Sequence, residues 1–106
     1  MFDFLKKEEM PSIPVNELDS MLGTIELIDI REAYEFEAGT IKTAKNIPMG
    51  TLLQNPSKCL LKNKTYYIMC QSGGRSARTV KELLKNGFQV INVNGGIGAY
   101  RGTKRK

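Results

Sequence analysis

The sequence predicts an α/β fold in which a mainly parallel central sheet carries helices on both faces. Short apolar runs typical of buried strands recur at 25–30, 66–70 and 90–93, and the first of them is rich in β-branched residues. Segments with apolar residues at helical spacing lie between these runs. Strands that alternate with helices in this way are typical of α/β sandwiches with a mainly parallel sheet.

The bulk properties of the chain fit one small domain. Its 106 residues suffice for a single core, which we expect over 11–106, after a charged lead-in over 1–10. No apolar run approaches the roughly 20 residues needed to cross a bilayer. The N-terminal segment has no long apolar stretch of the kind that marks a secretory signal. These features predict a cytoplasmic protein with no membrane partner.

The first half of the chain contains three predicted elements. Pro14 introduces a short helix over 15–22, whose apolar residues share one face, and the next residue is a glycine. The apolar run at 25–30 follows as a buried strand. The segment 31–38 suits another short helix, ended by Gly39.

The second half continues the alternation. A brief strand is predicted over 44–47, whereas 52–61 has no clear assignment because Pro56 argues against one continuous helix. The strands at 66–70 and 90–93 flank an amphipathic helix. That helix has apolar residues on one face and a glycine at its end.

Cys70 closes the strand at 66–70, and in open α/β sheets ligands bind beyond the carboxyl ends of strands. The loop that follows consists of Gln71, Ser72, Gly73, Gly74, Arg75 and Ser76. Because glycines lack a Cβ, this loop can curl and point backbone N–H groups inward. The helix that begins near Ser76 adds the positive end of its dipole, and Arg75 adds a full charge at the rim. We expect such a cradle to lower the pKa of the thiol and to hold a small oxyanion over the sulfur.

The composition excludes several other chemistries. The chain has no histidine, so Cys–His and Ser–His nucleophilic pairs are impossible. The two cysteines, Cys59 and Cys70, do not have the spacing of a zinc site, and we expect no metal or cofactor. The net charge of +5 includes the basic end 104–106, which we interpret as a solvated tail because no nucleic-acid motif accompanies it. A modest positive field helps to attract small anions.

The loop Cys70-Gln71-Ser72-Gly73-Gly74-Arg75-Ser76 resembles the active-site loop of rhodanese domains, in which the first residue carries the sulfur. Three further segments resemble the family's signatures, in the family's order: Asp29-Ile30-Arg31 with Glu35-Phe36, Gly39-Thr40-Ile41 through Ala44-Lys45-Asn46-Ile47-Pro48, and Gly95-Gly96-Ile97 with Tyr100. The chain departs from the family at Thr40, where histidine is usual, and at Tyr100, where tryptophan is common. The resemblance spans 29–100 and therefore indicates a single-domain member.

The resemblance implies a sulfurtransferase. Cys70 would take the outer sulfur of thiosulfate or a related anionic donor as a persulfide, then pass it to cyanide or a thiol, with a protein thiol as a further candidate acceptor. The loop 71–76 would bind the donor. The hydroxyls of Ser72 and Ser76 are expected to hydrogen-bond the sulfur, and Ser76 also suits the N-cap of the helix.

Asp29, Arg31 and Glu35 are predicted to support the site rather than to react. A buried charge must be paired, and Arg31 with Glu35 is one candidate pair. Cys59 is expected to be a small buried side chain, with a resolving cysteine as the alternative.

Three other functions remain open. Cysteine-based phosphatases and arsenate reductases use a similar cradle, but their pattern places five residues between Cys and Arg, whereas four separate Cys70 from Arg75. No Asp-Pro pair is present to supply a mobile general acid. Some rhodanese-like domains are non-enzymatic binding modules, usually after loss of the cysteine. The third function is relay of sulfur to a protein partner, which the sequence does not distinguish from transfer to small molecules.

Overall fold

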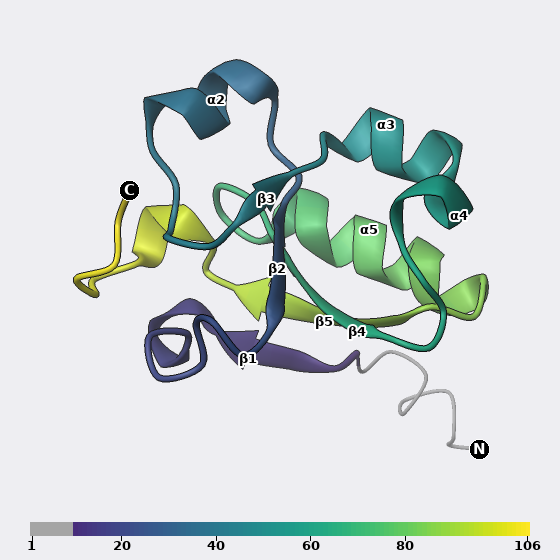
Figure 1. The fold of residues 1–106 in the computed structure, drawn as a ribbon, viewed down its shortest axis with the longest axis horizontal. Helices are drawn as coiled ribbons and strands as arrows, with labels where there is room; N and C mark the ends of the chain where they lie inside the picture. The colour runs from purple at the N-terminus through teal and green to yellow at the C-terminus, as the bar shows by residue number, and fades with distance from the viewer. Residues whose placement is uncertain (1–9) are drawn as a thin grey trace.

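The computed structural model describes residues 10–106, so the predicted lead-in falls outside the described residues except for Met10. Five strands form one parallel sheet in the order β1-β5-β4-β2-β3 (Figure 1). The strands are β1 (Ser12–Pro14), β2 (Glu26–Asp29), β3 (Lys45–Asn46), β4 (Thr65–Met69) and β5 (Gln89–Asn94). The predicted α/β fold with a parallel sheet is therefore confirmed.

The central strand β4 brings two of the predicted site segments together. It pairs with β2 on one side and with β5 on the other. Asp29 at the end of β2 is in register with Met69, the residue before Cys70. Because the strands are parallel, their carboxyl ends meet at one edge of the sheet, and the predicted site lies at that edge.

Three α-helices cover one face of the sheet: α3 (Met49–Gln54), α4 (Pro56–Cys59) and α5 (Gly74–Lys85). Side chains alternate between the faces, so Ile28 and Ile68 join the core under these helices. The break between α3 and α4 falls at Asn55, immediately before Pro56, as the proline predicts. Helix α5 begins at Gly74, and Gly73 is its N-cap residue. The N-cap role expected of Ser76 is therefore wrong, because Ser76 lies within the first turn.

The opposite face is covered mainly by short turns. The 3-10 helices η1 (Val15–Glu17) and η2 (Ile97–Ala99) lie over it, and Phe36 of α2 (Ala33–Ala38) packs against the same core cluster. Helix α2 has a capping box between Glu32 and Glu35, and it ends at Gly39 as predicted. Helices therefore flank both faces, and the longest of them, α5, lies on the other face.

The helix predicted over 15–22 is wrong beyond its first turn, because only Val15–Glu17 is helical. The polar residues of this segment bind other parts of the chain instead. Asn16 donates a hydrogen bond to the carbonyl of Ala99 at 3.0 Å, and Asp19 accepts one from the hydroxyl of Tyr100 at 2.5 Å. These long-range contacts override the helical spacing of the apolar residues.

No helix within residues 10–106 has both the length and the apolar character needed to cross a bilayer.

Candidate active site

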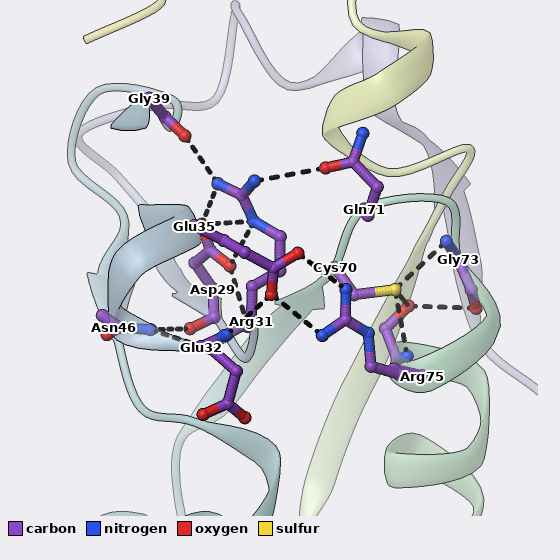
Figure 2. Close-up of polar contacts among 11 residues, drawn as sticks. Asp29, Arg31, Glu32, Glu35, Gly39, Asn46, Cys70, Gln71, Gly73 and Arg75 are labelled. Atoms are coloured by element: carbon purple, nitrogen blue, oxygen red, sulfur yellow. Dashed lines mark hydrogen bonds and ion pairs between the residues drawn. The ribbon is translucent and has the colours of Figure 1, made fainter. Parts of the chain in front are cut away.

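Cys70 lies immediately after β4, with its side chain enclosed by the loop that leads into α5 (Figure 2). Cys70 is only 1 % exposed. Its Sγ accepts hydrogen bonds from the backbone N–H groups of Gly73 at 3.1 Å and Ser76 at 3.3 Å. The thiol also contacts the hydroxyl oxygen of Ser76 at 3.4 Å. The structure thus forms the inward-facing cradle that the glycines of the loop predict.

The curl of the loop depends on Gly73. Its φ of 105° is a left-handed conformation that side chains rarely adopt, and a Cβ there would lie 3.3 Å from the backbone nitrogen of Gly95. Ser76 closes the curl by donating its hydroxyl to the carbonyl of Gly73 at 3.1 Å. The helix therefore begins with the N–H of Ser76, in its first turn, directed at the sulfur, where the helix dipole favours negative charge.

The surroundings of Cys70 favour the thiolate. Burial is the largest influence, and it raises the pKa of the Cys70 thiol. Hydrogen bonding to the side chain of Ser76 lowers this pKa, as do the backbone N–H groups of Ser76, Gly73 and Ser72. The hydrogen bonds together outweigh burial, so the net pKa lies below the ordinary value for a thiol. No imidazole is needed to hold the thiolate.

A second glycine requirement lies in the turn after β5, where the chain packs against the Cys70 loop. The carbonyls of Cys70 and Gln71 accept hydrogen bonds from the N–H groups of Ile97 at 2.9 Å and Gly98 at 2.8 Å. A Cβ at Gly96 would lie 2.4 Å from the carbonyl oxygen of Cys70, so only glycine fits. The sequence indicates a turn and a family signature here, but it does not reveal this contact.

Asp29 and Arg31 form a buried ion pair with a nitrogen–oxygen distance of 2.9 Å. Arg31 also donates to the carbonyl of Gly39 at 2.6 Å, and the Thr40 hydroxyl donates to the Asp29 carboxylate at 2.8 Å. The suggested pairing of Arg31 with Glu35 is therefore wrong. Residues two apart share one side of an extended segment, which explains why Arg31 reaches Asp29 instead.

Glu35 pairs with Arg75 of the loop, through contacts of 3.0 Å and 3.2 Å. The hydrogen bond from Arg75 is the main cause that lowers the pKa of the Glu35 carboxyl, and the same bond raises the pKa of Arg75. Arg31 makes a second link to the loop, because its Nη1 donates to the Gln71 side chain at 3.2 Å. Figure 2 shows both links, which reach from the segment 31–35 to the loop on either side of Cys70.

The remaining predicted residues are placed as follows. Gln71, Ser72 and Gly74 are exposed at the outer surface of the loop. Cys59 is a free thiol on α4, partly buried against the same core cluster as Cys70. Within residues 10–106, the structure brings no three His, Cys, Asp or Glu side chains together in a way that would hold a metal ion.

Comparison with known proteins agrees with this geometry. The rhodanese-like domain family matches residues 14–103. "Putative sulfurtransferase YtwF" of Bacillus subtilis is 42% identical over 81 residues, which cover 76% of this chain and 78% of that protein. The uncharacterized protein YqhL of the same organism is 40% identical over 78 residues, covering 73% of this chain. The chain spans only 61% of the length of YqhL.

Among solved structures, a rhodanese-like domain protein from Staphylococcus aureus is 37% identical, with a TM-score of 0.81. The alignment covers 92% of this chain and 97% of that one. The match to the family extends over most of the chain, and it includes both the Cys70 loop and the segments that hold it. The chain belongs to the rhodanese-like domain family.

Proposed function

We propose that the protein is a sulfurtransferase that carries sulfane sulfur as a persulfide on Cys70. The donor is thiosulfate or a related small anionic sulfur compound, and the acceptor is cyanide or a thiol, including a thiol of a protein. One observation carries the proposal: Sγ of Cys70 accepts hydrogen bonds from two backbone N–H groups, and the pKa of the Cys70 thiol lies below the ordinary value for a thiol. The sulfurtransferase name of the relative YtwF supports the same reaction.

The first step is nucleophilic attack of the Cys70 thiolate on the outer sulfur of thiosulfate. A new S–S bond forms, the original S–S bond breaks, and sulfite leaves with the electron pair. In the second step the acceptor attacks the outer sulfur of the persulfide, so that cyanide becomes thiocyanate and the Cys70 thiolate is regenerated. The N–H groups of Gly73 and Ser76 stabilise the Sγ thiolate that attacks in the first step and leaves in the second.

The loop 71–76 is proposed to bind the donor, with its members in different roles. Ser76 acts through its backbone N–H and its hydroxyl, and Gly73 through its backbone N–H. Gln71 and Ser72 are exposed and available to the donor. The guanidinium of Arg75 is paired with the Glu35 carboxylate, so we assign Arg75 to positioning the loop. Its positive charge lies near the donor but is already neutralised by Glu35.

Phosphoryl or arsenate chemistry is less well supported. With four residues between Cys70 and Arg75, the N–H groups converge tightly on the sulfur. Arg75 would have to leave Glu35 before it could bind a phosphoryl group. A non-enzymatic binding role is also disfavoured, because Cys70 is present with its cradle formed.

The proposed reaction suits a single domain over 11–106 that works in the cytoplasm. The family match covers 14–103, which leaves little of the chain outside it. Both cysteines are free thiols, and the cytoplasm keeps thiols in that state.

A paired assay separates the two chemistries. The protein is tested with thiosulfate plus cyanide, and separately with an aryl phosphate. We expect thiocyanate to form and the aryl phosphate to remain. Insertion of one glycine between Gly73 and Gly74 should abolish thiocyanate formation, because the N–H groups no longer converge on the sulfur. Phosphate release by the unaltered protein that far exceeds its sulfur transfer would contradict the proposal.

A further inference from the structure

A groove of about 390 Å³ lies between α3 and α5, away from the Cys70 cradle, and we call it the α3–α5 groove. The two helices contact each other along this side of the molecule (Figure 1). Six residues line it: Met49, Leu53, Arg78, Lys81, Glu82 and Lys85.

The rim of the α3–α5 groove is positively charged. Arg78, Lys81 and Lys85 recur at helical spacing, so they project from one face of α5, and all three are exposed. In the described part of the chain, Glu82 is the one carboxylate that lines the groove. Within residues 10–106, none of the three cations lies within ion-pair distance of a carboxylate. In contrast, Arg31 and Arg75 at the Cys70 site are both paired. Among the described residues, the lining of the groove carries three cations and the single carboxylate of Glu82, so its charge is positive.

The floor of the groove is apolar. Met49 and Leu53 are four residues apart on α3, so they lie on one face of that helix, and both are partly buried against the core. Two aliphatic contacts beneath a cationic rim fit a segment that combines carboxylates with an apolar side chain. Among residues 10–106, no aromatic side chain lines the groove to offer a ring on which nucleic-acid bases could stack. The lining therefore favours an acidic protein segment over a nucleic acid.

Of the groove's lining residues on α5, Arg78 is the one nearest in sequence to the Cys70 loop. Helix α5 begins at Gly74, directly after the Gly73 N–H that binds Sγ. Arg78 lies four residues later, about 6 Å along the helix axis. Helix α3 begins at the same edge of the sheet, where the N–H of Met49 binds the carbonyl of Ile30 at 2.9 Å. A protein seated in the groove would therefore place neighbouring parts of its surface next to the Cys70 loop.

We propose that the α3–α5 groove binds an acidic, apolar-containing segment of a protein that exchanges sulfur with Cys70. The proposal rests on the proposed sulfurtransferase function and names the class of its partner. Unpaired cations at the rim attract a negative surface before contact and so speed association, while Met49 and Leu53 receive the apolar side chain.

The test uses a fluorescently labelled synthetic peptide of glutamate and leucine, with binding to the full chain followed by anisotropy. We expect binding that weakens with added salt and when the peptide's glutamates are replaced by glutamine or its leucines by serine. The variant Lys81→Glu/Lys85→Glu should weaken binding by about tenfold or more. The matched control Lys42→Glu/Lys104→Glu makes the same change in net charge at exposed lysines away from α3 and α5, and it should change binding by no more than about twofold.

Three outcomes would overturn the groove proposal: no peptide binding, equal losses in the groove variant and the control, or tighter binding of a thymidine oligonucleotide that is lost in the same groove variant. Intact mass after thiosulfate treatment tests the reaction separately. If Cys70 gains sulfur but the peptide does not bind in the groove, the groove proposal fails and the proposed reaction stands. If the peptide binds in the groove but Cys70 gains no sulfur, the proposed reaction fails and the docking surface stands.

Discussion

Two regions surround Cys70, and they use charge in different ways. The loop 70–76 presents partial charges to the sulfur, from the N–H groups of Gly73 and Ser76. The facing segment 29–35 carries full charges, and its Asp29 and Glu35 carboxylates are paired with arginines rather than directed at the sulfur. Different residues therefore stabilise the thiolate and hold the loop in place. Removal of the Ser76 hydroxyl should therefore change the pKa of the thiol, whereas loss of an ion pair should lower stability and, at the Glu35–Arg75 pair, also loosen the loop.

The largest effect is expected at Cys70 itself. Cys70→Ser should retain the fold and lose all sulfur transfer, because serine is close in size but lacks the polarizable nucleophile. Circular dichroism and thiocyanate formation measure the two properties. The control is Cys59→Ser, which should keep most of the activity. If it loses activity without losing stability, Cys59 acts as a resolving cysteine.

Asp29→Asn should have the largest effect on stability. It leaves the buried guanidinium of Arg31 without its carboxylate, a change that typically costs about 3–5 kcal/mol. Urea unfolding gives the loss directly. Glu26→Gln is the matched control, because Glu26 pairs with Lys64 at 3.4 Å on the surface, where such pairs contribute about 0–1 kcal/mol. Equal losses of stability in the two variants would show that the buried Asp29–Arg31 pair contributes no more to stability than a surface pair.

Loss of the Glu35–Arg75 pair should have an intermediate effect. Both side chains are partly exposed, so Glu35→Gln or Arg75→Ala should lower stability by only about 1 kcal/mol. Both variants should slow transfer from thiosulfate and from a neutral, thiol-bound sulfane donor to the same extent, because the loop that serves both donors is loosened. Glu37→Gln, exposed on the same helix, is the control. A loss confined to thiosulfate would mean that the guanidinium binds the anion directly.

The Glu35–Arg75 pair also predicts a pH dependence. The pKa of Glu35 is lower in the folded protein, so the stabilisation is present above the carboxyl's ordinary pKa and is lost as pH falls through the folded pKa. The difference in stability between the unaltered protein and Glu35→Gln should therefore vanish in acid. A difference that persists there would contradict this assignment.

Ser76→Ala should produce the smallest change, in the pH profile of thiol reactivity. Hydrogen bonding to the Ser76 side chain is the largest of the influences that lower the pKa of Cys70, so its removal should move the alkylation curve to higher pH. Iodoacetamide kinetics in a Cys59→Ser background report on Cys70 alone. Ser72→Ala keeps its backbone N–H and should leave the curve in place. A curve unmoved by Ser76→Ala would contradict the cradle as described.

Much of the fold follows from local patterns. The strands predicted at 25–30, 66–70 and 90–93 correspond to β2, β4 and β5, because buried β-branched runs have few alternatives. Strand β1 was not predicted, because it has three residues, ends at Pro14 and owes its place to pairing with β5. Helix η2 is equally short, and it is held against the Cys70 loop by hydrogen bonds to the carbonyls of Cys70 and Gln71, which are distant in the sequence.

The site is predictable to the extent that it is local. The Cys70 cradle is contained in one loop, so its glycines and the following helix suffice to predict it. The Asp29–Arg31 pair could have been found from the spacing of two residues along an extended segment. The Glu35–Arg75 pair joins residues 40 apart in the sequence, and the close approach of Gly96 to Cys70 requires β5 to lie beside β4. Neither contact has a signal in a single sequence.

Intact mass after exposure to thiosulfate, followed by peptide mapping, tests the central claim most directly. The protein should become heavier by one sulfur atom, located on the peptide that contains Cys70, and cyanide should return it to its original mass. Cys70→Ser should gain nothing. Sulfur on Cys59 with Cys70 unmodified, or no gain from thiosulfate or any other sulfane donor, would contradict the assignment of Cys70 as the sulfur carrier.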